Sequence, residues 1–175
     1  MSGTKFQLKT PAAGDYQTSF VITDINSDGI EEAFVFYTDS SSVESSARMA
    51  YMECIDGEWS ISSDIKGAGT GVKDVNFIDL NNDGLKEVFV SWSLLEGKTT
   101  NIVSAFELVS SNTKNLTLNS LGNEYCNDKS FVDFNNDGTT DFVLVYIDDS
   151  GAVLKPVIRM FTLTEKNKLY KYGET

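Results

Sequence analysis

A nine-residue pattern occurs three times in this chain and constrains its fold more than any other feature. The copies begin at Asp24, Asp79 and Asp133, so they recur with a period of about 54 residues. Each copy reads D-x-N-x-D-G-x-x-[DE], in which five positions are specified. Three copies at a near-constant period indicate an internal repeat, in which each period builds one structural unit.

These three acidic loops, residues 24–32, 79–87 and 133–141, hold most of the negative charge of the chain. The sequence has 26 acidic and 14 basic residues, and its formal net charge is −12. Positions 1, 5 and 9 of the loops carry nine carboxylates, so only three units of excess negative charge lie elsewhere. Carboxylates gathered so closely repel one another unless a cation lies among them.

The spacing of oxygen atoms in the loops suits calcium. Positions 1, 3 and 5 offer carboxylate, amide and carboxylate oxygens, position 7 offers a backbone carbonyl, and position 9 offers a third carboxylate. With water, these five ligands reach the six to eight oxygens that Ca²⁺ takes. The glycine at position 6 permits the positive φ of a sharp bend. We therefore expect three calcium sites, with these ligands: Asp24, Asn26, Asp28, Ile30 and Glu32; Asp79, Asn81, Asp83, Leu85 and Glu87; Asp133, Asn135, Asp137, Thr139 and Asp141.

Two other readings of the loops have to be weighed. An EF-hand shares the opening of the pattern, but it needs an acidic residue at position 12. That position holds Val35, Val90 and Leu144 here, which disfavours an EF-hand. The second alternative is a turn rich in Asn, Asp and Gly that binds no metal, and the third carboxylate at position 9 argues against it.

The residues around each loop predict β-strands. A short apolar stretch precedes each loop, and a run rich in β-branched and aromatic residues follows it, at 33–37, 88–92 and 142–147. Two further strands complete each period, and the Asp56-Gly57 pair between two of them favours a tight hairpin. The predicted fold is all-β, with three four-stranded antiparallel repeats that resemble β-propeller blades, in a complete or a partial propeller. We expect one domain over 1–175, with blades at about 18–65, 74–121 and 129–173 and an extra strand at 5–10.

The loops and their flanking strands resemble the FG-GAP or VCBS repeat family. That resemblance implies an integrin alpha-chain-like β-propeller, in which each blade carries a calcium loop between its first two strands. The segments 5–19, 56–59 and 67–71 resemble secreted or lipid-anchored propeller proteins of Gram-positive bacteria, which implies an extracellular or cell-surface location. The resemblance implies no activity that can be carried over to this chain.

Three repeats are fewer than the four to eight blades of a closed propeller. We expect the chain to be a fragment of a longer protein that supplies further blades. Two alternatives remain open: the ring is completed by oligomerisation, or the chain is a compact unit capped by Phe6–Lys9 as an extra strand.

Composition excludes several classes of function. The strong negative charge disfavours nucleic acid as a partner. The absence of histidine excludes Ser-His-Asp, Cys-His and His-zinc chemistry. Apolar runs such as Phe142–Ile147 are too short for a transmembrane helix. Cys54 and Cys126 belong to blades that are not neighbours, so we expect free thiols rather than a disulfide.

We therefore expect a calcium-binding extracellular module that binds a protein or a glycan and is not an enzyme, with calcium in a structural role. The alternatives are a structural spacer of a larger surface protein and, less favoured, a polysaccharide-acting enzyme. Ligand contacts are expected at the end opposite the acidic loops, from 38–47, 66–73, 94–101, 122–129 and 148–156.

Overall fold

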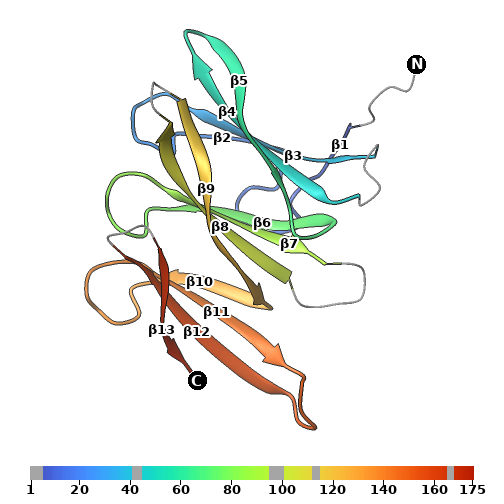
Figure 1. Cartoon of the computed structure of the whole chain (residues 1–175), viewed down its shortest axis with the longest axis vertical. Coiled ribbons are helices and arrows are strands. Elements are labelled where there is room, and N and C mark those ends of the chain that lie inside the picture. The colour runs from blue at the N-terminus through green and yellow to red at the C-terminus, as the bar shows by residue number, and fades with distance from the viewer. Residues whose placement is uncertain (1–5, 41–44, 95–100, 112–114, 165–167) are drawn as a thin grey trace.

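A computed structural model describes residues 6–40, 45–94, 101–111, 115–164 and 168–175 (Figure 1). These residues form thirteen β-strands in three antiparallel sheets, which confirms the predicted all-β class. None of the described residues forms a helix long and apolar enough to cross a membrane. The three sheets follow one another along the molecule as blade-like units, and they do not form a closed propeller.

The first sheet contains five strands, because two short strands share one edge of β3. Its strands are β1 (Phe6–Leu8), β2 (Phe20–Thr23), β3 (Glu32–Asp39), β4 (Ala47–Ile55) and β5 (Glu58–Lys66). β1 pairs with the second half of β3 and β2 with the first half, so the two lie end to end. The predicted extra strand at 5–10 is therefore present as β1, but it extends this edge and does not cover a face of the sheet.

The second and third sheets each contain four strands in chain order. Their strands are β6 (Gly71–Ile78), β7 (Glu87–Ser93), β8 (Asn101–Ser111) and β9 (Asn115–Cys126), then β10 (Asp128–Val132), β11 (Asp141–Asp148), β12 (Lys155–Leu163) and β13 (Leu169–Glu174). The four-stranded repeat is thus confirmed in the described residues. β6 begins at Gly71, three residues before the predicted start of the second blade at about 74, and β9 ends at Cys126, five residues after the predicted end at about 121. The connection between β12 and β13, where Lys166 and Asn167 suggest a turn, lies partly outside the described residues.

The core lies between the sheets. One apolar cluster joins the first and second sheets and a second cluster joins the second and third. In β7, Val88, Val90 and Trp92 belong to the first cluster, whereas Phe89 belongs to the second. A strand that is buried on both faces is apolar on both faces, which explains why no polar alternation marks β7 in the sequence.

The chain reverses at opposite ends of the sheets in a regular way. The three acidic loops connect β2 to β3, β6 to β7 and β10 to β11, and they lie on the left in Figure 1. The predicted Asp56-Gly57 hairpin joins β4 to β5, and both residues have positive φ, of 53° and 83°. It lies at the same end as the acidic loops, as expected when successive strands run antiparallel.

The backbone at Gly69 passes so close to β7 that no side chain fits there. A Cβ atom on Gly69 would lie 2.2 Å from the backbone oxygen of Ser93, which cannot move without disrupting β7. We expect Gly69→Ala to lower the free energy of unfolding by about 1–3 kcal/mol, measured by urea denaturation. Gly151→Ala is the control, because its Cβ would meet nothing closer than 3.9 Å. Equal stability of the two variants would contradict this packing.

Candidate functional site

The three acidic loops share one set of internal hydrogen bonds. The N–H of position 6 donates to the position-1 carboxylate at 3.0, 3.0 and 2.9 Å in loops 1, 2 and 3. The N–H of position 5 donates to the position-3 amide oxygen at 3.0, 3.1 and 2.9 Å. The N–H of position 7 donates to the position-5 carboxylate at 2.7, 2.8 and 2.8 Å. The repeated sequence therefore produces the same local geometry three times.

The loops bend through two residues with positive φ. Position 4 holds Ser27, Asn82 and Asn136, with φ of 60°, 58° and 63°. Position 6 holds the three glycines, with φ of 83°, 90° and 90°. The expectation that glycine permits the sharp bend is confirmed, because a residue with a Cβ atom is strained at these angles. The positive φ at position 4 was not predicted.

The position-9 carboxylates are buried at the start of β3, β7 and β11. Glu32 and Glu87 are each 3% exposed, and Asp141 is fully buried. Each accepts a hydrogen bond from the position-2 backbone N–H, that of Ile25, Leu80 or Phe134, at 3.0, 2.9 and 3.0 Å respectively. This bond joins the beginning of each loop to the strand that follows it.

Burial makes the negative charge of these carboxylates costly. It raises the pKa of Glu32 to about 7, an effect that the Ile25 N–H opposes and the Asp28 and Asp24 carboxylates reinforce. Burial likewise raises the pKa of Glu87 to about 7, against the effect of the Leu80 N–H. A cation among these carboxylates would favour their ionised form.

One loop carboxylate has a buried oxygen with no hydrogen-bond donor. Asp24 Oδ1 has no partner within the part of the chain that the structure describes, whereas the buried Asp141 carboxylate interacts with the Tyr172 hydroxyl. A buried oxygen without a donor loses the hydrogen bonds that water would make in the unfolded chain. A hard cation could supply the missing interaction at Asp24 Oδ1. The carboxylate and amide oxygens of the loops are ligands that suit such an ion.

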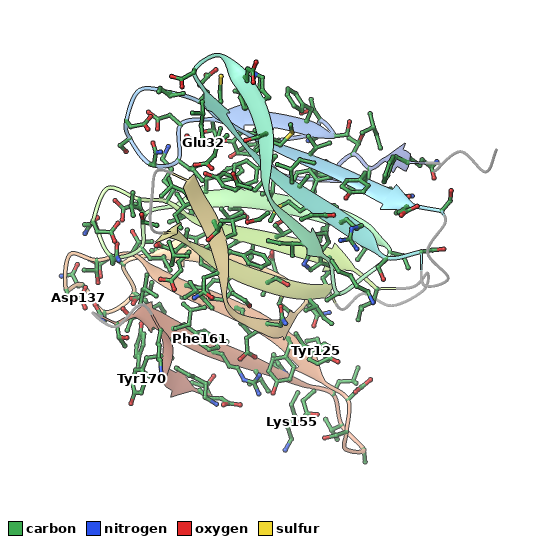
Figure 2. The ribbon with its side chains drawn as sticks, turned by 45° about the horizontal axis from the view of Figure 1, so that its top comes forward. Glu32, Tyr125, Asp137, Lys155, Phe161 and Tyr170 are labelled. Atoms are coloured by element: carbon green, nitrogen blue, oxygen red, sulfur yellow. The ribbon has the colours of Figure 1, made fainter. Side chains whose placement is uncertain are left out.

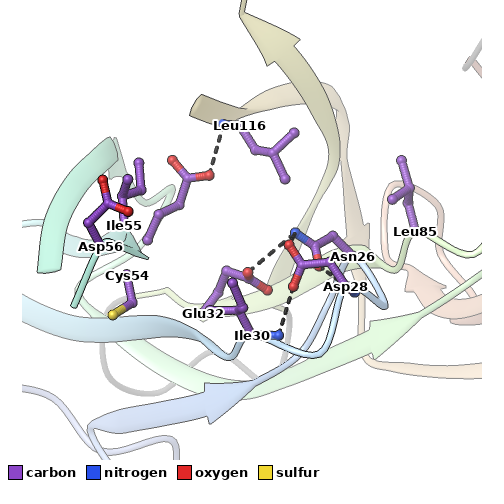
Figure 3. A pocket seen from close by; sticks show the side chains of 10 residues that line it. Asn26, Asp28, Ile30, Glu32, Cys54, Ile55, Asp56, Leu85 and Leu116 are labelled. Atoms are coloured by element: carbon purple, nitrogen blue, oxygen red, sulfur yellow. Dashed lines mark hydrogen bonds between the residues drawn. The ribbon is translucent and has the colours of Figure 1, made fainter. Parts of the chain in front are cut away.

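The carboxylates of a loop do not converge on one point in this structure. Among the described residues, no group of three or more Asp, Glu or Cys side chains is placed to hold a metal ion. The hydrogen bonds within the loop explain this arrangement. In loop 1, the Asp28 carboxylate accepts from the Ile30 N–H and from Asn26 Nδ2, and it is exposed, whereas Glu32 is buried. Asn26 Nδ2 also donates to Glu32 Oε1, at 3.4 Å, so the amide N–H group lies between two carboxylates that were predicted to share an ion (Figure 3). The fifteen predicted ligands are therefore grouped by loop, without the arrangement of a metal site.

Hydrogen bonds also link each acidic loop to the next. Ser27 Oγ donates to the Gly84 carbonyl at 2.9 Å, and Asn82 Nδ2 donates to the Gly138 carbonyl at 3.3 Å. Both bonds run from position 4 of one loop to position 6 of the following loop. Lys86 adds two more, from its N–H to the Ile25 carbonyl and from Nζ to the Asp24 carbonyl, each at 2.8 Å. We did not predict these contacts, because their donors, Ser27, Asn82 and Lys86, lie at unspecified positions of the loop pattern.

A pocket of about 500 Å³ lies beside loop 1 (Figure 3). Asn26, Asp28 and Glu32 line one side, and Glu53 and Leu116 line the other. Glu53 is 7% exposed, and it accepts hydrogen bonds from the Leu116 N–H at 2.9 Å and from the Ser62 hydroxyl. Sequence reasoning missed Glu53, since a single acidic residue in a strand gives no sign that it is buried between sheets.

The aromatic side chains divide into buried and exposed groups. Tyr51 and Trp92 are fully buried between the first two sheets. Trp59 and Tyr125 remain 44% and 57% exposed, and Tyr125 lies at the end of β9, opposite the acidic loops. Cys54 and Cys126 are both free, as expected, but they belong to neighbouring sheets, because β9 of the second sheet extends to Cys126, and Cys54 is only half-buried. Parts of the expected ligand-binding loops, 41–44 and 95–100, lie outside the described residues.

No family model matches this chain, and no curated protein matches it significantly. The resemblance to FG-GAP or VCBS repeats therefore stays a prediction from the loops and strands.

The raised pKa values predict how the metal-free protein responds to pH. Glu32 and Glu87 stay protonated in the folded state up to about pH 7, whereas glutamate in the unfolded chain ionises near 4.5. The free energy of unfolding should therefore fall as the pH rises from about 4.5 to 7 and then level off. Urea denaturation in EDTA measures this dependence.

The variant Glu32→Gln removes one of the two groups, so its stability should depend less steeply on pH over that interval. Glu58→Gln is the matched control, because Glu58 is exposed at the start of β5. The same slope in both variants would contradict the role of burial at Glu32.

Proposed function

We propose that this chain is a calcium-stabilised β-propeller module that binds a protein or a glycan outside the cell. One observation carries the proposal: an acidic loop occurs three times at a near-constant period, and in its first copy the buried Asp24 Oδ1 has no hydrogen-bond donor in the described residues. The resemblance of the loops to FG-GAP or VCBS repeats supports the same conclusion.

The donor set favours a hard cation. The side chains at positions 1, 3, 5 and 9 provide only carboxylate and amide oxygens, and the chain contains no histidine. Calcium accepts such ligands in variable number and geometry, whereas zinc prefers nitrogen and sulfur. When bound, the ion would neutralise the negative charge of the loop carboxylates, which accept hydrogen bonds from N–H groups of the same loops. The ligands would be the fifteen residues predicted for the three sites.

Calcium in these loops would act on stability and not on catalysis. The position-9 carboxylates hold the start of β3, β7 and β11, and the loops are hydrogen-bonded to one another. An ion bound in one loop would therefore also stabilise the neighbouring loop, through the hydrogen bonds between the two. The carboxylates at positions 1, 5 and 9 already accept hydrogen bonds from the loop backbone, which suits ligands better than proton-transfer groups.

The end opposite the acidic loops supports ligand binding. Tyr125 is exposed there (Figure 2), next to Cys126, which belongs to the core between the second and third sheets. Nearby, Arg159 lies 4.6 Å from the centre of the Tyr146 ring and pairs with Glu124 at 2.9 Å. An exposed tyrosine beside polar groups offers both a stacking face and hydrogen bonds, which suits a sugar ring or a protein side chain.

The expected affinity supports an extracellular location. Calcium sites in extracellular modules commonly have dissociation constants of about 10⁻⁴–10⁻³ M. Such sites fill at the calcium concentration outside cells, and filling them favours the folded state.

We expect calcium to stabilise the folded chain. At a calcium concentration one hundred times Kd, each filled site adds about 2.7 kcal/mol to the free energy of unfolding. Thermal unfolding with millimolar calcium and with EDTA tests this, and isothermal titration calorimetry should report three sites. Asp83→Asn should remove part of the stabilisation and one site, whereas Asp149→Asn, outside the loops, should leave both unchanged. Identical melting curves in calcium and EDTA would exclude a calcium role.

We expect Tyr125 to contribute to ligand binding. A glycan array and a screen of extracellular proteins, both in calcium, would first identify a ligand. Tyr125→Ala should then weaken its binding by about tenfold, the loss of one aromatic contact. Trp59→Ala is the control, because Trp59 is also exposed but lies beside the Asp56-Gly57 turn at the opposite end. A chain that binds no ligand in either screen would instead favour a structural spacer.

A further inference from the structure

Corresponding residues of the three sheets differ in exposure where no further sheet of the chain covers them. Position 2 of the loops holds Ile25, Leu80 and Phe134. Ile25 is 0% exposed and Leu80 is 1% exposed, because each packs in the junction with the following sheet. Phe134 is 58% exposed. The third sheet thus presents a large aromatic side chain where the first two sheets bury an aliphatic one.

Strands β4, β8 and β12 show the same difference in side-chain exposure. Met49, Val103 and Ile158 are equivalent, because each pairs with the residue twelve positions after the first aspartate of its loop. Met49 and Val103 are 0% and 2% exposed in the junctions, whereas Ile158 is 37% exposed. The open face of the third sheet is therefore apolar at the positions that other sheets use for packing.

The first sheet has the complementary open face. In the second sheet, Val75 faces the first sheet and is fully buried. Its equivalent in the first sheet is Phe20, four residues before Asp24, which is 47% exposed. Ile22, Trp59 and Ile61 share this outer face according to the strand pairing, with 41%, 44% and 62% exposure. Adjacent apolar side chains on an open sheet face are typical of a contact surface.

The position-4 hydrogen bonds between neighbouring acidic loops run in one direction along the chain, from loop 1 to loop 2 and from loop 2 to loop 3. Position 4 donates to the position-6 carbonyl of the next loop in both junctions, from Ser27 and from Asn82. Asn136 is the position-4 residue of loop 3, and no acidic loop follows it in the described residues. Gly29 offers the equivalent carbonyl in loop 1, where no loop precedes it. Loop 3 therefore offers a hydrogen-bond donor and loop 1 offers a hydrogen-bond acceptor.

We propose that the third sheet of one chain packs against the first sheet of a second copy, so that two chains close head to tail. The new junction would use the same positions as the existing ones, with Phe134 and Ile158 against Phe20 and Ile22 and with Asn136 donating to the Gly29 carbonyl of the other copy. Each chain supplies three blades, so a closed pair contains six, within the four to eight of closed propellers. This inference goes beyond the proposed function and does not depend on calcium binding.

The oligomeric state tests the proposal. Sedimentation equilibrium and light scattering, in calcium and in EDTA, should give twice the chain mass of 19.3 kDa at micromolar concentration. Ile158→Glu on the third sheet and Phe20→Glu on the first should each give a monomer with an unchanged circular dichroism spectrum. Leu154→Glu is the matched control, since Leu154 is 67% exposed in the β11–β12 loop, away from the paired strands of both faces, and should stay dimeric.

Mixing the two monomeric variants separates a head-to-tail contact from other dimers. Phe20→Glu retains an intact third sheet and Ile158→Glu retains an intact first sheet, so their mixture should form a heterodimer through one intact junction. A Phe20→Glu variant that dimerises by itself would overturn the head-to-tail arrangement in favour of contact between two third sheets. Species larger than a dimer would overturn the closed pair.

A wild-type chain that stays monomeric at high micromolar concentration would overturn the proposal, and a further blade of a longer chain would then be the occupant of the open faces. Calcium binding is judged by melting and calorimetry and not by mass, so failure of this proposal is distinguishable from failure of the calcium proposal.

Discussion

The hydrogen bond between the buried position-9 carboxylate and the position-2 backbone N–H is the interaction on which the repeated structure depends. It occurs in all three loops and joins the start of each loop to the strand that follows. Because this carboxylate is buried, its charge is costly, and the pKa values of Glu32 and Glu87 rise accordingly. The same bond thus shapes the loop and creates the electrostatic cost that a calcium ion would offset.

The structural unit of this chain is the junction between sheets rather than the single sheet. Each junction combines an apolar cluster with a hydrogen bond between neighbouring acidic loops. The second sheet is buried on both faces, whereas the first and third are each covered on one face. The outer faces of the first and third sheets expose apolar side chains, and the preference of apolar surface for burial is the reason why we propose these faces as sites of association.

Local sequence patterns predicted the features that depend on local chemistry. The Asp56-Gly57 turn, the glycine bends and the strands after each loop follow from turn propensity and β-branched runs, so they were predicted correctly. The early start of β6 and the late end of β9 depend on pairing with β7 and β8, and sequence patterns do not report such pairing. Glu53 was missed for a similar reason, because its hydrogen-bond partner Leu116 lies 63 residues away in the chain.

The sequence by itself determined that the chain repeats, that each repeat is β-structure and that its carboxylates are concentrated in three loops. Those properties follow from spacing, turn residues and charge, which act over a few residues. Only the tertiary structure decided which oxygens lack a donor, which loop residues bond to the next loop and which apolar side chains remain uncovered. These depend on the packing of one sheet against another, so equivalent motifs such as those around Leu80 and Phe134 have different surroundings.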